Sequence, residues 1–125
     1  MKLILTGGGI GEKAKTAFSL FAKEVNGGEI LYIPFAEDRM SIDENVEWFT
    51  EQIKPYGITK INVIKTAKNL TKEKIDKSAG IFIGGGNSFY LLKQLKENHR
   101  LHLIQNALQS EKIILGLSAG ATIFE

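Results

Sequence analysis

A serine at position 118 stands between two glycines in the segment GLSAG, residues 116–120. The apolar run 113–115 leads directly into this segment. The spacing is typical of a nucleophile elbow, in which a strand turns sharply into a helix and presents a serine hydroxyl at the edge of a sheet. Glycines flank the serine because side chains there would collide with neighbouring backbone in so tight a turn. The pattern indicates nucleophilic attack by Ser118 on a carbonyl carbon.

A second glycine-rich segment, GGGN at residues 84–87, follows the apolar run 81–83 and opens an amphipathic stretch. Backbone N–H groups in such a turn can point at an anion without obstruction by side chains. In acyl transfer these groups form half of an oxyanion hole, and the other half is the N–H of the residue after the nucleophile, here Ala119. A simpler interpretation stays open, namely a glycine turn followed by a helix that Asn87 or Ser88 caps.

Short apolar runs alternate with amphipathic stretches along the whole chain, which predicts parallel strands joined by crossover helices. The expected strands are residues 2–6, 29–34, 60–64, 80–84 and 112–115. The expected helices are a first one with Ala14, Phe18, Phe21 and Ala22 on one face, a second over residues 42–53 after the cap Ser41, and three more over residues 71–77, 88–97 and 101–109. The sequence therefore predicts an α/β fold, a three-layer sandwich with a mainly parallel sheet.

In such a sheet the loops that follow the strands gather at one edge, where ligands bind. Residues 7–11, 35–40, 66–70 and 85–88 are therefore expected on the same edge as Ser118. The glycines of residues 7–11 match neither the dinucleotide frame nor a phosphate-binding loop, so we expect no nucleotide there. Arg39 is a candidate for binding a substrate carboxylate at this edge. A simpler interpretation stays open, in which residues 37–39 form a charged loop exposed to solvent.

Composition narrows the functional classes. The 125 residues carry a formal net charge of +2, contain no cysteine, and fit one domain spanning residues 1–125. The lysines are scattered rather than clustered, which argues against nucleic acid as a partner. Without cysteine there is no thiolate nucleophile or thiolate metal site. The absence of a long apolar stretch and of a signal-peptide pattern predicts a cytoplasmic protein without membrane contact.

Two motifs taken together, IGGGNSFYLL at residues 83–92 and GLSAGA at residues 116–121, resemble those of the peptidase E and cyanophycinase family of serine peptidases. The first strand with its glycine turn and the segment YIP at residues 32–34 also resemble the amino-terminal half of that family. The resemblance covers essentially all of the chain. It implies a class I glutamine amidotransferase-like (flavodoxin-like) fold and hydrolysis of small, often aspartyl, peptides without a metal or organic cofactor.

The resemblance also implies roles for individual residues. Ser118 would be the nucleophile, and the Gly85–Gly86 region with Ala119 would supply the oxyanion donors, Gly86 being the preferred one. Gly85 and Asn87 are further candidates for substrate binding. The resemblance also implies a histidine and an acidic partner after the serine, but no histidine follows Ser118 in this sequence, and the only acidic residue after it is Glu125.

We therefore expect an amino-terminal portion of a longer hydrolase, incomplete at its carboxyl end and inactive by itself. Because its missing strands would leave apolar surface uncovered, we also expect it to form homo-oligomers or to be unstable. Two alternatives stay open: a non-catalytic binding or assembly module derived from the same fold, and a hydrolase completed by a histidine from another chain.

Several other side chains have a structural interpretation. His99 and His102 are expected far from Ser118, because eleven residues of helix carry the chain roughly 16 Å toward the opposite edge. Arg100 would lie near that edge too. No carboxylate falls in register with the two histidines, so they do not indicate a metal site. Aromatic residues of the second helix region, and Phe89, Leu91, Leu92 and Leu95 of the fourth, are expected to pack in the core, whereas Tyr90 can turn toward the site.

Overall fold

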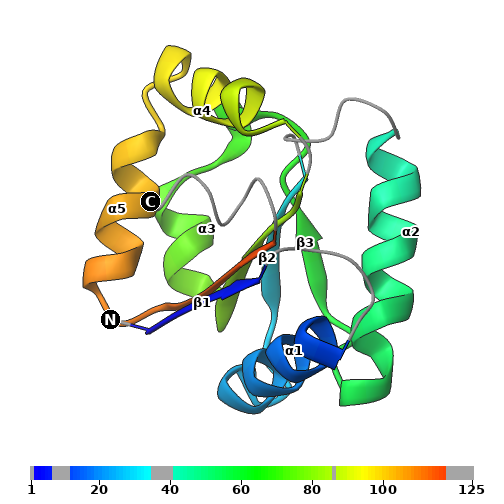
Figure 1. Cartoon of the computed structure of the whole chain (residues 1–125). Coiled ribbons are helices and arrows are strands. Elements are labelled where there is room, and N and C mark those ends of the chain that lie inside the picture. Colours follow the sequence, from blue (N-terminus) through cyan, green and yellow to red (C-terminus); the bar gives the residue numbers. More distant parts are fainter. Residues whose placement is uncertain (1, 7–11, 35–40, 86, 118–125) are drawn as a thin grey trace.

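The computed structural model describes residues 2–6, 12–34, 41–85 and 87–117 of the chain, and these form one parallel sheet covered by helices (Figure 1). Within them the strands are β1 (Lys2–Thr6), β2 (Ile30–Ile33), β3 (Ile61–Val63), β4 (Gly80–Ile83) and β5 (Ile113–Leu117). Their order in the sheet is β1-β5-β4-β2-β3, and every neighbouring pair is parallel. The predicted strands and their parallel arrangement are confirmed.

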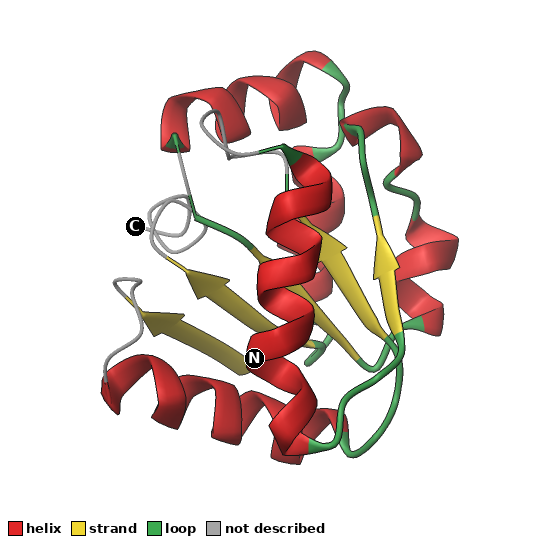
Figure 2. Ribbon diagram, turned by 90° about the vertical axis from the view of Figure 1, so that its right-hand side faces the viewer, coloured by secondary structure: helices red, strands yellow, loops and turns green. Residues whose placement is uncertain are grey.

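Helices connect these strands and lie on both faces of the sheet (Figure 2). They are α1 (Glu12–Val25), α2 (Ile42–Ile53), α3 (Lys72–Lys77), α4 (Ser88–Glu97) and α5 (Leu101–Gln109), with short 3-10 helices η1 (Lys54–Tyr56) and η2 (Ala67–Asn69). The predicted cap of α2 is present, since the Ser41 hydroxyl accepts a hydrogen bond from the Glu44 N–H at 3.1 Å. No helix in the described ranges is long and apolar enough to cross a membrane.

Alternate residues of each strand face opposite sides of the sheet and build two separate cores. Leu31 and Ile33 of β2 belong to the core under α3, α4 and α5. Ile30 and Tyr32 of the same strand belong to the core under α1 and α2. The three central strands β2, β4 and β5 are buried on both faces, as the middle of a parallel sheet between two helical layers requires, whereas the edge strands β1 and β3 are only partly buried. The three-layer sandwich expected from the sequence is confirmed.

Gly80 allows α1 to approach the sheet closely. A Cβ atom at this position would lie 2.9 Å from Val25 Cγ2 and 3.1 Å from Phe21 Cε1, both of which belong to α1. Phe21 is fully buried there. The glycine at the start of β4 therefore sets the spacing between α1 and the sheet.

The direction of helix α4 differs from the prediction that it carries the chain toward the opposite edge of the sheet. It lies across the carboxyl-terminal edge of the sheet, and α5 rather than α4 returns the chain to the opposite edge (Figures 1 and 2). The reason is the position of its apolar residues, because Leu91 and Leu95 are buried in the same core as Ile33 and Ile83, the last residues of β2 and β4. Phe89 is 86% exposed, so the expectation that it packs in the core is wrong.

Candidate active site

The carboxyl ends of β4 and β5 meet at the centre of one edge of the sheet. Ile83 of β4 pairs with Gly116 of β5, and Leu117 pairs with Thr6 of β1. Strand β5 extends two residues beyond its predicted end, to the residue that directly precedes Ser118. Ser118 and Ala119 themselves lie outside the described residues. The structure therefore places the two strands that lead into the motifs side by side, with their carboxyl ends at the same edge of the sheet.

The glycine turn begins as an extension of the sheet. The Gly84 N–H donates a hydrogen bond to the Ile33 carbonyl oxygen at 3.1 Å, so it continues the ladder between β4 and β2. A donor engaged in this way is not available to an oxyanion. Of the three glycines in this turn, Gly85, which is partly buried, and Gly86, which lies outside the described residues, remain as candidate oxyanion donors.

Asn87 caps helix α4. Its Oδ1 atom accepts a hydrogen bond from the Tyr90 N–H at 3.1 Å, and its backbone is extended, with φ −93° and ψ 110°. This confirms the capping interpretation for Asn87. The capping bond engages Oδ1, so a substrate contact would be made by the Nδ2 amide of this exposed residue. Gly85 and Asn87, the two described substrate-binding candidates, both stand at the predicted edge.

Arg39 lies outside the described residues, but the helix that follows it does not. Ser41, the cap of α2, stands two residues after Arg39, and α2 begins at the carboxyl-terminal side of the sheet. Asp43 in the first turn of α2 is 3.8 Å from the Lys65 ammonium just after β3, and both side chains are mostly exposed. Such exposed pairs contribute little to stability.

The α4–α5 corner lies nearer to the carboxyl-terminal edge than the sequence indicated. His99 has a left-handed backbone, φ 56°, and its N–H donates to the Lys96 carbonyl, while the Arg100 N–H donates to that of Leu95. This pattern is a Schellman motif. The Arg100 guanidinium then donates through Nη2 to the Lys68 carbonyl oxygen at 3.3 Å, in η2 after β3. The prediction that Arg100 lies near the opposite edge is therefore wrong, because α4 crosses the sheet edge instead of descending from it.

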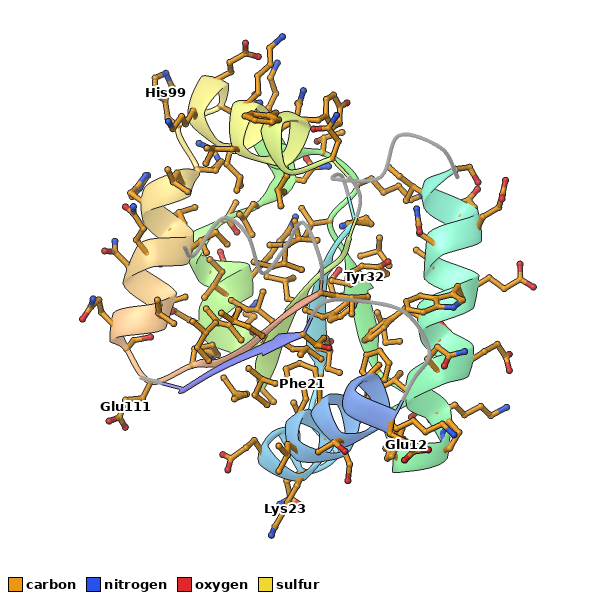
Figure 3. All side chains as sticks on the ribbon, in the orientation of Figure 1. Glu12, Phe21, Lys23, Tyr32, His99 and Glu111 are labelled. Atoms are coloured by element: carbon orange, nitrogen blue, oxygen red, sulfur yellow. The ribbon has the colours of Figure 1, made fainter. Side chains whose placement is uncertain are left out.

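Neither histidine has the environment of a catalytic base. His99 and His102 are both exposed, and Figure 3 shows His99 projecting from the end of α4. Among the described side chains, no ion pair joins a histidine to a carboxylate. A general base normally needs such a partner to hold its tautomer and orientation. Over the same part of the chain, no group of three or more histidine, aspartate or glutamate residues is arranged to hold a metal ion.

Two polar residues next to the site were missed by the sequence reasoning. Tyr32 and Asn45 are buried in the core under α1 and α2, with 2% and 9% of their surfaces exposed. The Tyr32 hydroxyl donates to the Asn45 carbonyl oxygen at 3.4 Å. One signal was present, because Asn45 interrupts the apolar face of α2, four residues before Phe49.

Comparison with known proteins identifies the family. The model of peptidase family S51 matches residues 3–125. The chain belongs to peptidase family S51. Among family relatives, peptidase E of Salmonella arizonae (strain ATCC BAA-731 / CDC346-86 / RSK2980) is 35% identical over 108 residues, which are 86% of this chain and 46% of that protein. Peptidase E of Pasteurella multocida (strain Pm70) is 34% identical over 103 residues, 82% of this chain and 43% of that protein.

This S51 chain spans about half the length of the curated relatives it matches. Solved structures agree on the fold. A crystal structure from Listeria monocytogenes EGD-e, which carries the peptidase E name, has a TM-score of 0.76 and 27% identity, and the match covers 98% of this chain and 61% of that one. A peptidase from an acI-B1 Actinobacterium has a TM-score of 0.74 at 23% identity, covering 98% and 55%. The fold predicted from the two motifs is thus confirmed.

Proposed function

We propose that this S51 chain carries the nucleophile and the oxyanion donors of a serine peptidase of the peptidase E kind. The observation that supports this most is the parallel pairing of β4 with β5, with Ile83 opposite Gly116. Segments that follow neighbouring parallel strands leave the sheet at the same edge, which supports a site built from the glycine turn and the GLSAG segment. Membership of family S51 over residues 3–125 supports the same reaction.

The proposed reaction is amide hydrolysis through an acyl-enzyme. The Ser118 hydroxyl oxygen attacks the scissile carbonyl carbon, and the electrons of the C=O double bond move to its oxygen. The N–H groups of Gly86 and Ala119 stabilise this oxyanion, and each such donor contributes about 3 kcal/mol to lowering the barrier. The C–N bond then breaks, and the amine leaves with the proton taken from Ser118. Water attacks the resulting ester, releases the acid and restores the hydroxyl.

Proton transfer from Ser118 requires a general base, and the described part of the chain offers no suitable histidine for that role. Both histidines are exposed, and neither pairs with a carboxylate in the described ranges. A triad enzyme without its base retains only the small rate that substrate binding and the oxyanion hole provide. We therefore propose that the 125 residues alone are nearly inactive. The alternative function, a non-catalytic binding or assembly module, shares this prediction and differs in the reactivity of Ser118.

Small peptides, aspartyl peptides among them, are the proposed substrates. A guanidinium would bind their carboxylate bidentately. Of the two arginines, Arg100 is engaged with the carbonyl oxygens of Asn98 and Lys68, at 2.9 and 3.3 Å. Arg39, in the segment before α2, is therefore the proposed carboxylate clamp. Gly85 and Asn87 complete the proposed binding surface.

Active-site labelling tests this function. The chain is incubated with a fluorophosphonate, and its intact mass is followed over time beside that of a Ser118→Ala variant. We expect one adduct, formed slowly, in the parent chain and none in the variant. Rapid stoichiometric labelling would contradict the lack of an efficient base. If no adduct forms even after prolonged incubation, Ser118 is not a nucleophile and the module is the better function.

A further inference from the structure

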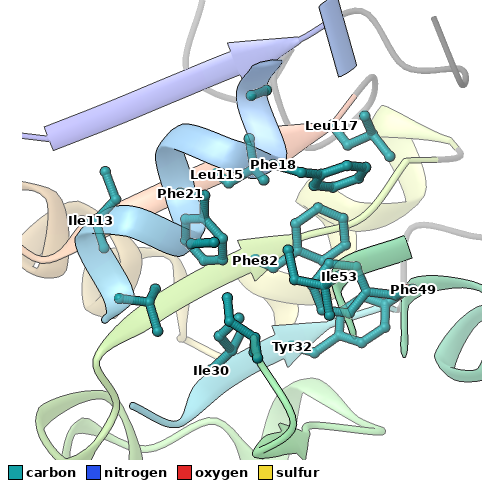
Figure 4. Packing of buried hydrophobic residues seen from close by; sticks show 14 of the residues in the cluster. Phe18, Phe21, Ile30, Tyr32, Phe49, Ile53, Phe82, Ile113, Leu115 and Leu117 are labelled. Carbon is teal, nitrogen blue, oxygen red and sulfur yellow. The ribbon is translucent and has the colours of Figure 1, made fainter. Parts of the chain in front are cut away.

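The polar pair Tyr32 and Asn45 interrupts an otherwise apolar and aromatic core. The Tyr32 ring packs against Phe49 and Phe82, with ring centroids 4.8 and 5.1 Å away (Figure 4). Phe49 and Phe82 in turn stack on each other at 4.0 Å. A phenylalanine at position 32 would keep this packing without the cost of burying a hydroxyl. The hydroxyl is therefore expected to hold something in place.

On one side, the hydroxyl is connected to the start of α2. It donates to the Asn45 carbonyl oxygen at 3.4 Å, a long hydrogen bond. The Asn45 side chain donates through Nδ2 to the Ser41 carbonyl oxygen at 3.2 Å. Ser41 is the cap of α2 and directly follows the segment that contains Arg39. Two hydrogen bonds, one buried and one partly buried, thus run from the sheet through Asn45 to Ser41, the cap of α2.

On the other side, the same phenol borders the glycine turn. A Cβ atom placed on Gly84 would lie 3.4 Å from both Cε1 and the hydroxyl oxygen of Tyr32. The ring therefore occupies the space beside Gly84 into which a larger side chain would project. The position of Gly84 is also held by strand β2, because the Gly84 N–H donates a hydrogen bond to the Ile33 carbonyl oxygen. The Tyr32 phenol therefore donates a hydrogen bond to the first turn of α2 and lies beside Gly84, where the glycine turn begins.

We propose that Tyr32 is a positioning residue that holds Gly84, where the glycine turn begins, and Ser41, the cap of α2, at a fixed separation. The purpose of this coupling rests on the proposed function. The turn would supply oxyanion donors at the scissile carbonyl, and Arg39 would bind the substrate carboxylate. The Tyr32 link then sets the span between these two groups of a peptide, and so favours one substrate length over others.

The test is a Tyr32→Phe variant, which keeps the ring and removes only the hydroxyl. The matched control is Tyr56→Phe, because the Tyr56 hydroxyl also donates to a backbone carbonyl, that of Lys15, at 3.4 Å. Amide NMR shifts and hydrogen exchange are measured in both. In Tyr32→Phe we expect the Glu44, Gly84 and Gly85 amide signals to shift together, and the Gly84 amide to exchange about fivefold faster. The control should leave these signals unchanged.

A second variant, Asn45→Leu, removes the side-chain hydrogen bond to the Ser41 carbonyl oxygen with little change in side-chain size, and it keeps the backbone bond that the Asn45 N–H donates to the same oxygen at 3.1 Å. It should shift the same amide signals as Tyr32→Phe, through the other end of the link. The proposal is overturned if either variant moves the Glu44 signal while those of Gly84 and Gly85 stay in place. Neither measurement uses labelling or turnover, so a failure here is distinguishable from a failure of the peptidase function.

Discussion

Replacing Asn87 separates its capping role from a role in the site. Asn87→Ala removes the acceptor of the Tyr90 N–H, now 3.1 Å from Oδ1. The loss of such a cap costs 0.5–2 kcal/mol, and about 1 kcal/mol is expected here. The reason is that Tyr90 is 43% exposed, so water replaces part of the lost bond. For a chain of 125 residues, that corresponds to a fall of about 4 °C in melting temperature.

Asn87→Asp is the matched variant. It keeps an acceptor for Tyr90 and adds a negative charge at the start of α4, where the helix dipole favours it by about 0.3–1 kcal/mol. Its stability should therefore equal or exceed that of the parent chain. The same charge beside the glycine turn opposes a developing oxyanion. We expect it to slow fluorophosphonate labelling of Ser118 roughly tenfold.

The assay is thermal and urea unfolding followed by circular dichroism, with labelling rates measured on the same samples. If Asn87→Ala is as stable as the parent chain, the Asn87 cap contributes nothing to the stability of α4. If Asn87→Asp is stable but labels at the parent rate, the turn does not face the developing charge. That second result would remove the glycine turn from the proposed oxyanion hole.

Three further predictions concern packing, backbone strain and substrate. Gly80→Ala should destabilise the chain by about 1–3 kcal/mol in urea, because its Cβ would lie 2.9 Å from Val25 Cγ2; an unchanged midpoint would contradict the close packing of α1. Glu111→Gly should stabilise it by about 1 kcal/mol, since Glu111 has φ 67° after α5, whereas Glu111→Ala should give no gain. Arg39→Ala should weaken binding of acidic dipeptides at least tenfold in an NMR titration; unchanged affinity would remove Arg39 from the proposed site.

The positions of helices and strands were predictable because the signals are local. Alternating apolar runs and amphipathic stretches define the elements, and Ser41 and Thr71 mark helix starts by accepting hydrogen bonds from residues three positions later. The direction of α4 was not predictable in this way. Its apolar residues specify which face is buried but not which part of the core they meet. In the structure, α4 lies across the edge of the sheet, and Leu91 and Leu95 are buried in the core that also contains Ile33 and Ile83, the last residues of β2 and β4.

In the candidate site, too, the local motifs were predictable from the sequence, whereas the contacts between distant residues were not. GLSAG and GGGN are short motifs, and the spacing of their glycines can be recognised from the sequence alone. Whether the Gly84 N–H is free to bind an anion depends on its neighbour in the sheet, and it is bonded to Ile33, some 50 residues earlier. The contacts of Tyr32 with Asn45 and Gly84 likewise join three separate elements. No local pattern encodes such contacts, although a polar residue on an apolar helix face was one indication.

By itself, the sequence determined the elements, the motifs and, through their resemblance, the S51 family, because steric and capping requirements act between residues close in the chain. Only the tertiary structure decided that β5 lies between β1 and β4 and that α4 crosses the sheet edge. It also decided that the Gly84 N–H is hydrogen-bonded within the sheet, to the Ile33 carbonyl oxygen. Those outcomes follow from burial of apolar faces and pairing of backbone groups across long sequence separations. They place the turn after β4 next to the end of the strand that leads to Ser118.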